Sequence, residues 1–207
     1  MSGEKIDIFK MFKEEYKAGK KPLVVETGRA MYLAAEGKSA PGSEEFQSAI
    51  EGLYGMAYTI KMGRKKAGKG DYTISKLEGI YWTTDGADLA TAPVENWCWL
   101  LMIRTPESVD GHPLTEDDLT TALSLLHDRK KEAGADRVKL MYLDPARYVQ
   151  MLHVGPYEME HETLAVMAGF CAAENLEPHG RHHEIYLSDP RRVAPEKLKT
   201  ILRMQVG

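Results

Sequence analysis

Two glutamates lie at the start of strand-like segments rich in aromatic residues, and they have the clearest potential for chemistry. Glu78 belongs to LEGIYW (77–82) and Glu184 to HEIYL (183–187). A carboxylate among apolar side chains is costly to bury in its ionised form. Such a group is often retained to meet a cation or to transfer a proton, and its pKa is often raised. The alternative is that both glutamates pair with surface arginines.

The alternation of side chains along a strand predicts which aromatic residues accompany each glutamate. Successive residues of a strand point to opposite faces. The residues predicted to share a face are Glu184 with Tyr186, Glu78 with Trp82, and Trp97 with Trp99. Aromatic rings offer flat apolar area and a negative face that attracts cations. The pattern favours a site for lipophilic, planar or cationic molecules, although tryptophans of this kind also occur as ordinary core residues.

The histidines give a weaker signal. His182 and His183 lie in HGRHHE (179–184) but point to opposite faces of the expected strand, and the chain has no CxxC or HExxH, so no metal site is predicted. His153 is either a hydrogen-bonded strand residue or a wall of the ligand pocket. The sequence also lacks GxSxG, P-loop and GxGxxG motifs, so no cofactor is expected.

Composition narrows the class of protein further. The chain has 207 residues, 43% of them hydrophobic, and a formal net charge of −4, which gives no basic surface for nucleic acid. The basic run 61–69 is interpreted as a solvated loop, because no aromatic residue is interleaved to stack on bases. No apolar stretch is long enough to span a membrane, and the N-terminus is too charged for a secretory signal. These features predict a cytoplasmic protein in which Cys98 and Cys171 are free, buried thiols.

The apolar periodicity predicts an α+β fold. Helices are expected over residues 6–16, after a cap at Ser43, after a cap at Thr115, and over 158–174. The expected strands are 23–36, 72–83, 96–104, 138–142, 148–154, 183–188 and 201–206. The strands 138–142 and 148–154 are predicted to form a hairpin around Asp144-Pro145.

The order of these elements repeats. A strand, a glycine (Gly37), a helix and the Glu78 strand are followed by a strand, a glycine (Gly155), a helix and the Glu184 strand. We therefore predict two tandem strand–helix–strand–strand modules with pseudo-two-fold symmetry around a central ligand cleft. The alternative is one α+β domain with a coincidental order of elements.

Several segments resemble the GyrI-like small-molecule-binding family. They are FQSAIEGLYGMAYTIKM (46–62), LEGIYW, NWCWLLMIRTPE (96–107), VQMLHVGPY (149–157) and HHEIYLSDPRRVAPEKLKTILR (182–203). The resemblance implies an N-terminal extension (1–20) and a GyrI-like domain (21–206), with modules of about 21–107 and about 108–206. Residues 1–20 are too few for the helix-turn-helix domain of the regulators in that family, so no nucleic-acid partner is expected.

The resemblance also implies a function. In drug-sensing members, a buried glutamate matched by Glu184 meets lipophilic cations. Stand-alone members of similar length look like hydrolases of cyclopropanoid DNA-alkylating compounds, which would serve detoxification. The implied site residues are Glu184, assisted by Glu78, as the catalytic pair, with ligand contacts from Tyr54, Trp82, Trp97, Trp99, His153 and Tyr186. Two other interpretations stay open, which are a drug-binding or ligand-sensing module without catalysis and an inhibitor of a DNA topoisomerase.

Overall fold

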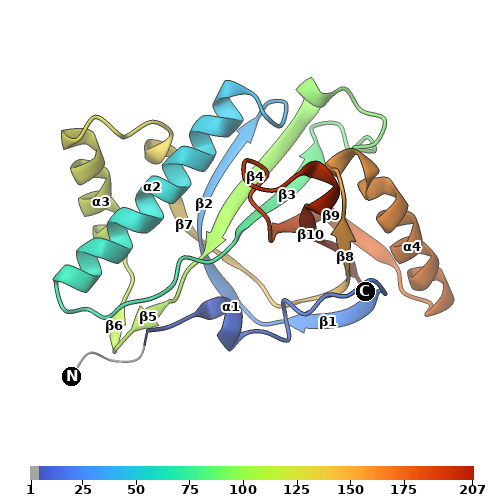
Figure 1. Ribbon diagram of the computed structural model, residues 1–207, viewed down its shortest axis with the longest axis horizontal. Coiled ribbons are helices and arrows are strands. Elements are labelled where there is room, and N and C mark those ends of the chain that lie inside the picture. Colours follow the sequence, from blue (N-terminus) through green and yellow to red (C-terminus); the bar gives the residue numbers. More distant parts are fainter. Residues whose placement is uncertain (1–4) are drawn as a thin grey trace.

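One eight-stranded antiparallel sheet carries the fold in the computed structural model, which describes residues 5–207 (Figure 1). The strand order is β1-β8-β10-β9-β3-β4-β2-β7. The strands are β1 (Leu23–Thr27), β2 (Ala30–Lys38), β3 (Leu77–Thr83), β4 (Trp97–Arg104), β7 (Lys139–Leu143), β8 (Ala146–Val154), β9 (Pro178–Tyr186) and β10 (Lys199–Val206). A separate two-stranded ribbon joins β5 (Ser108–Val109) to β6 (His112–Pro113). The α+β prediction is confirmed.

Side-chain caps that the sequence predicts begin two of the helices. The helices are α1 (Ile8–Met11), α2 (Glu44–Lys66), α3 (Glu116–Asp128) and α4 (Glu160–Ala173). The Ser43 side chain accepts a hydrogen bond from the backbone N–H of Phe46, and Thr115 forms a capping box with Asp118. No helix among residues 5–207 has the length and apolar content to cross a membrane.

The basic run was wrongly predicted to be a loop, because its first six residues form the last turns of α2. Cationic side chains at a helix C-terminus interact favourably with the helix dipole, which suits this position. Arg64 is also buried, and its guanidinium donates to the carboxylate of Asp118 at 2.6 Å. Arg64 therefore ties α2 to α3, while most other residues of the run are exposed to solvent as expected.

The two halves of the sheet have matching strand orders. The segment β2-α2-β3-β4 contributes the strand order β3-β4-β2, and the segment β8-α4-β9-β10 contributes the order β9-β10-β8. The two halves join where β3 pairs with β9. This arrangement agrees with the repeat found in the sequence.

The predicted hairpin of residues 138–142 and 148–154 is wrong. β7 pairs with β2 of the first half, and β8 pairs with β1 and β10. Each half thus completes its sheet with a strand that precedes the other half, and α3 packs beside α2. Local alternation marks a segment as a strand, but it does not choose the partner strand.

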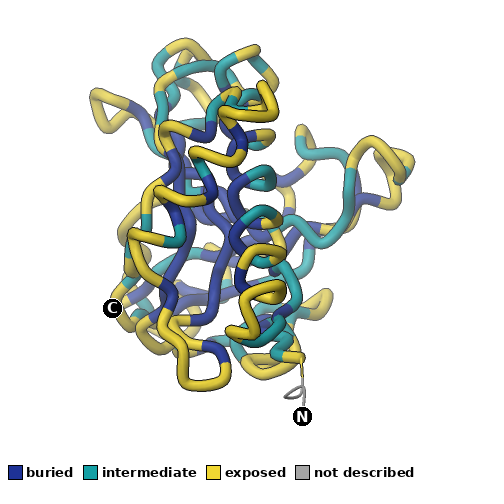
Figure 2. The backbone as a smooth tube through the Cα atoms, turned by 90° about the vertical axis from the view of Figure 1, so that its left-hand side faces the viewer, coloured by how far each residue is buried: buried dark blue, intermediate teal, exposed yellow. Residues whose placement is uncertain are grey.

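The two faces of the sheet are covered differently. α2 and α4 lie over one face, called here the helix face, and Figure 2 shows the strands behind the helices as mostly buried. The core under α2 includes Leu33, Leu53, Trp99 and Leu101, and the core under α4 includes Val149, Met167, Cys171 and Leu202. Both cysteines are free and buried, as predicted.

The N-terminal segment covers the opposite face. The Tyr16 hydroxyl donates to Glu78 Oε1 at 3.0 Å, Arg104 donates to Glu15 Oε2 at 2.7 Å, and Gln150 Nε2 donates to the carbonyl of Lys17 at 2.6 Å. Residues 5–20 of the predicted extension therefore cover the part of this face around Glu78, while residues 1–4 lie outside the described residues.

Candidate functional site

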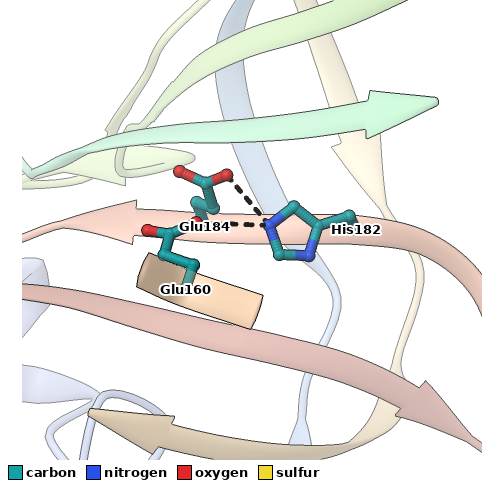
Figure 3. Close-up of side chains that lie close together, drawn as sticks. All are labelled: Glu160, His182 and Glu184. Atoms are coloured by element: carbon teal, nitrogen blue, oxygen red, sulfur yellow. Dashed lines mark hydrogen bonds and ion pairs between the residues drawn. The ribbon is translucent and has the colours of Figure 1, made fainter. Parts of the chain in front are cut away.

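Three ionisable side chains meet on the helix face, where the two halves of the sheet join. His182 and Glu184 come from β9 and Glu160 from the first turn of α4 (Figure 3). His182 Nε2 donates to Glu184 Oε1 at 2.9 Å and lies 3.9 Å from Glu160 Oε2. These three residues are called the triad below. Their side chains are 16%, 11% and 10% exposed for His182, Glu184 and Glu160, so they are enclosed but reachable.

Local structure explains why these side chains converge. His182 and Glu184 are two residues apart on one strand and therefore share a face. Before α4 the chain turns at Gly155, whose φ of 146° suits glycine. His153 holds this turn, because its Nε2 donates to the carbonyl of Pro156 at 3.0 Å while its Nδ1 accepts from Thr163 at 2.9 Å. The turn delivers the start of α4, and with it Glu160, to β9.

The protonation states of the three triad side chains depend on one another. Burial disfavours a charged imidazole, but hydrogen bonds and charges from Glu160 and Glu184 raise the pKa of His182 to about 9. Burial, and secondarily the Glu184 charge, raise the pKa of Glu160 to about 7 against the opposing effect of His182. At neutral pH the imidazole is therefore an imidazolium between two carboxyl groups, and Glu160 holds a proton part of the time.

Tyrosines surround the triad. The hydroxyls of Tyr81 and Tyr186 lie 2.5 Å apart, and the Tyr157 ring meets the Tyr186 ring edge-on with centroids 6.0 Å apart. Burial, followed by the Glu184 charge, raises the pKa of Tyr81 and of Tyr186, so both stay neutral hydrogen-bond donors. Trp97 packs edge-on against Tyr81 with centroids 6.1 Å apart. The site thus joins a charged cluster to an aromatic wall.

Gly79 makes room for this wall. It pairs with Glu184 across the β3–β9 ladder, and a Cβ at this position would lie 2.7 Å from the Tyr81 hydroxyl oxygen. The Tyr81 ring therefore lies over the backbone of its own strand, where it reaches Tyr186. A side chain at position 79 would displace the ring.

The structure brings some of the predicted residues together on the helix face. Glu184, Tyr186 and Trp97 lie at the site, as just described. Trp99 shares their face but is fully buried under α2, with its Nε1 donating to Ser39 at 3.1 Å. Tyr54 is half-buried on α2 and stacks on the neighbouring Tyr58 with centroids 6.4 Å apart.

Other predicted residues lie elsewhere. Glu78 is fully buried on the opposite face, where His183 Nε2 donates to its Oε2 at 2.9 Å. Trp82 shares that face, and the Arg181 guanidinium lies 3.7 Å from the centroid of its ring. The reason is the ladder register, in which Gly79 and not Glu78 stands opposite Glu184. The structure does not bring Glu78 or Trp82 to the triad, and His153 holds the turn before α4.

Sequence reasoning missed four residues of the site, namely Tyr81, Tyr157, Glu160 and His182. The available signal was that His182 and Glu184 are two residues apart on one strand and therefore point to the same face. Glu160, His182 and Glu184 also offer donor atoms that a divalent metal accepts. The 2.9 Å contact between His182 and Glu184 is a hydrogen bond, however, so that nitrogen would have to lose its proton before it could coordinate. We therefore interpret the triad as a proton-sharing cluster.

Comparison with known proteins gives a family. The GyrI-like small molecule binding domain matches residues 25–206. An uncharacterized conserved protein from Listeria innocua is 37% identical with a TM-score of 0.88, and the alignment covers 98% of this chain and 100% of that one. A hydrolase from Listeria innocua is 36% identical with a TM-score of 0.87, covering 99% and 100%.

More distant structures share the fold alone. The C-terminal domain of EcmrR is 8% identical with a TM-score of 0.54, over 90% of this chain and 97% of that domain. Among curated proteins, none matches. The family match spans nearly the whole chain and agrees with the sheet and helices described above. The chain therefore belongs to the family of GyrI-like small molecule binding domains.

Proposed function

We propose that this protein binds flat, lipophilic xenobiotics on the helix face and hydrolyses those that carry a strained cyclopropane, as DNA-alkylating cyclopropanoids do. The observation that carries the proposal is the triad beside the Tyr81–Tyr186 pair, where a carboxylate, an imidazolium and neutral hydroxyls share one enclosed site. Family membership supports ligand binding, and the 36% identical Listeria hydrolase supports a hydrolytic reaction. Such a role suits a cytoplasmic protein that intercepts alkylators before they reach DNA.

The reaction needs a base and an acid. A water oxygen attacks a ring methylene carbon, the carbon–carbon bond of the cyclopropane breaks, and the electron pair moves to the conjugated carbonyl oxygen. Glu184 takes the water's proton through Oε2, because His182 already occupies Oε1. The new oxyanion takes up a proton, and Glu160, with its pKa near 7, is a carboxyl group that holds one at neutral pH. Base assistance of this kind is worth about 10²–10⁴-fold in rate.

The aromatic wall serves binding. Tyr81, Tyr157, Tyr186 and Trp97 supply flat apolar area with low rotamer entropy, and the hydroxyl groups supply polar contacts. Water excluded from this wall cannot weaken the electrostatic contacts within the triad.

The test is turnover at sub-stoichiometric protein. Purified protein is incubated with an excess of a cyclopropanoid alkylator, and the products are followed by mass spectrometry. We expect each protein molecule to convert many alkylator molecules to the hydrolysed product. For Glu184→Gln we expect kcat to drop 10²-fold or more. Glu162→Gln, an exposed change on α4, is the matched control and should keep the wild-type rate. A folded Glu184→Gln variant with full activity would contradict the role of Glu184.

A second candidate function is binding without turnover. The family description as a small molecule binding domain favours it. The protein would then protect DNA from the alkylator only by binding it. This protection would saturate at one ligand per site, and the ligand would be recovered unchanged. Quenching of tryptophan fluorescence without a water adduct would identify this outcome, because Trp97 lies in the wall.

A further inference from the structure

We propose that His182 is a resident counter-ion that adapts this site to neutral lipophilic molecules and weakens the binding of permanent cations. The inference rests on the proposed function in one respect, since it takes the triad and its aromatic wall as the ligand site. It narrows the ligand class, because a glutamate among aromatic rings would by itself suit a lipophilic cation.

The position of His182 is the first argument. Its Nε2 contacts both carboxyl groups, at 2.9 Å from Glu184 and 3.9 Å from Glu160. A ligand cation drawn to these carboxylates would have to occupy the place that the imidazolium already fills. The ring is enclosed, with its side chain 16% exposed and its centroid 6.4 Å from that of Tyr81. The charge is therefore part of the site and not a freely moving surface group.

The local charge is the second argument. The titratable groups that face His182 are Glu184 and Tyr186 of its own strand, Glu160 of α4, Tyr81 of β3 and Tyr157 of the turn before α4. At neutral pH the tyrosines are uncharged, Glu160 is partly protonated and the imidazolium cancels one carboxylate. The cluster then carries a net charge between 0 and −1. Without His182, the Glu184 carboxylate would lose its counter-ion, while burial and the Glu184 charge would favour the protonated, uncharged form of Glu160.

The neighbouring cations do not change this count. Arg181 precedes His182 in sequence but lies over Trp82 on the opposite face, and His183 bonds Glu78 on that same face. A ligand cation within about 4–6 Å of the triad would therefore meet one fixed positive charge, at a separation where charges interact strongly even in a moderately polar site. Removing that charge should strengthen cation binding by roughly tenfold or more.

The experiment compares two probes of similar shape. Tetraphenylphosphonium is a permanent lipophilic cation, and triphenylphosphine oxide is neutral and does not titrate. Affinities are measured by calorimetry and by tryptophan fluorescence for the wild type, His182→Gln, and the control His127→Gln, which changes an exposed histidine of α3. We expect the wild type to prefer the neutral probe. His182→Gln should gain tenfold or more for the phosphonium and change less than threefold for the oxide.

Two further measurements keep the proposal falsifiable. Adding Glu184→Gln to His182→Gln should abolish the gain, because the carboxylate would no longer be present to attract the cation. In the wild type, phosphonium affinity should rise between pH 7 and 10 as His182 loses its proton, which needs no variant that might fail to fold. The control should match the wild type throughout.

The outcomes separate the two proposals. Phosphonium binding that is equally tight in the wild type and in His182→Gln, and independent of pH, would overturn the counter-ion role while leaving a ligand site in place. Wild-type preference for the cation would overturn it as well. If neither probe bound any variant, the ligand site itself would be wrong, and the counter-ion role with it.

Discussion

Two carboxylate–histidine pairs lie back to back across β3 and β9, and they differ in what surrounds them. His182 and Glu184 face the helices, whereas His183 and Glu78 face the N-terminal segment. Both pairs have a hydrogen bond of 2.9 Å, yet the side chains of His183 and Glu78 are only 2% and 0% exposed. Each pair consists of one histidine and one glutamate, so the covering elements decide which pair stays partly exposed.

The protonation behaviour of the pairs differs accordingly. Two carboxyl groups flank His182 and raise its pKa to about 9. Burial, assisted by the charges of Arg203 and His182, lowers the pKa of His183 despite its bond to Glu78. Burial would raise the pKa of Glu78, but the bonds and charges of its partners hold that pKa below the ordinary value. The inner pair, His183 and Glu78, is therefore a buried structural contact, while the outer pair, His182 and Glu184, remains partly exposed at the ligand site that we propose.

The largest expected difference between the pairs concerns stability. Glu78→Ala leaves the Tyr16 hydroxyl and His183 without their shared partner in a fully buried place, and should lower the free energy of unfolding by about 3–5 kcal/mol. Glu184→Ala should cost about 1 kcal/mol, because His182 keeps Glu160 and water can enter. Urea unfolding of both variants measures the contrast. Equal losses would show that the two faces are not sealed differently.

A smaller effect is expected from pH. The pKa of His182 is raised on folding from about 6.5 to about 9, so its stabilising contribution is complete below pH 6.5 and is lost as the pH rises through 9. Glu160 acts in the same direction at lower pH, since its raised pKa makes folding favour the protonated form until the pH passes about 7. The wild type should lose about 1–3 kcal/mol between pH 6.5 and 9.

Unfolding at a series of pH values isolates the contribution of His182. His182→Gln should lose less stability than the wild type over the same range, whereas His127→Gln, with its exposed histidine, should keep the wild-type slope. If the stability of His182→Gln fell with pH as steeply as that of the wild type, His182 would not bind its proton more tightly in the folded state than in the unfolded state.

The smallest predicted effect comes from the aromatic wall. Gly79→Ala would place a Cβ 2.7 Å from the Tyr81 hydroxyl oxygen, so the ring must shift and its bond to Tyr186 should weaken. We expect affinity for a planar ligand to fall about tenfold, which corresponds to about 1.4 kcal/mol. Gly169→Ala on α4 meets nothing within 4 Å and is the matched control. Fluorescence titration of both variants would refute the role of Gly79 if they bound alike.

Much of the fold could be predicted because it depends on local patterns. The Ser43 and Thr115 caps begin helices as expected, and the repeated order of strand, glycine, helix and strand matches the two halves of the sheet. The length of α2 was underestimated, since glycines and cations after its apolar stripe were read as a loop. Tertiary contacts support these last turns, because Arg64 donates to Asp118 of α3 while Lys61 and Lys65 pair with Asp71.

The candidate site could be predicted only in part. By itself, the sequence determined that Glu184 and Tyr186 share a face, because alternation within one strand is a property of the backbone. It could not determine that Glu160 joins them, or that Glu78 lies on the other side. Those facts depend on how α4 docks and on the register that sets Gly79 opposite Glu184, between strands about a hundred residues apart. A shift of one residue in that ladder would exchange the faces, and only the packing of the whole sheet selects one register.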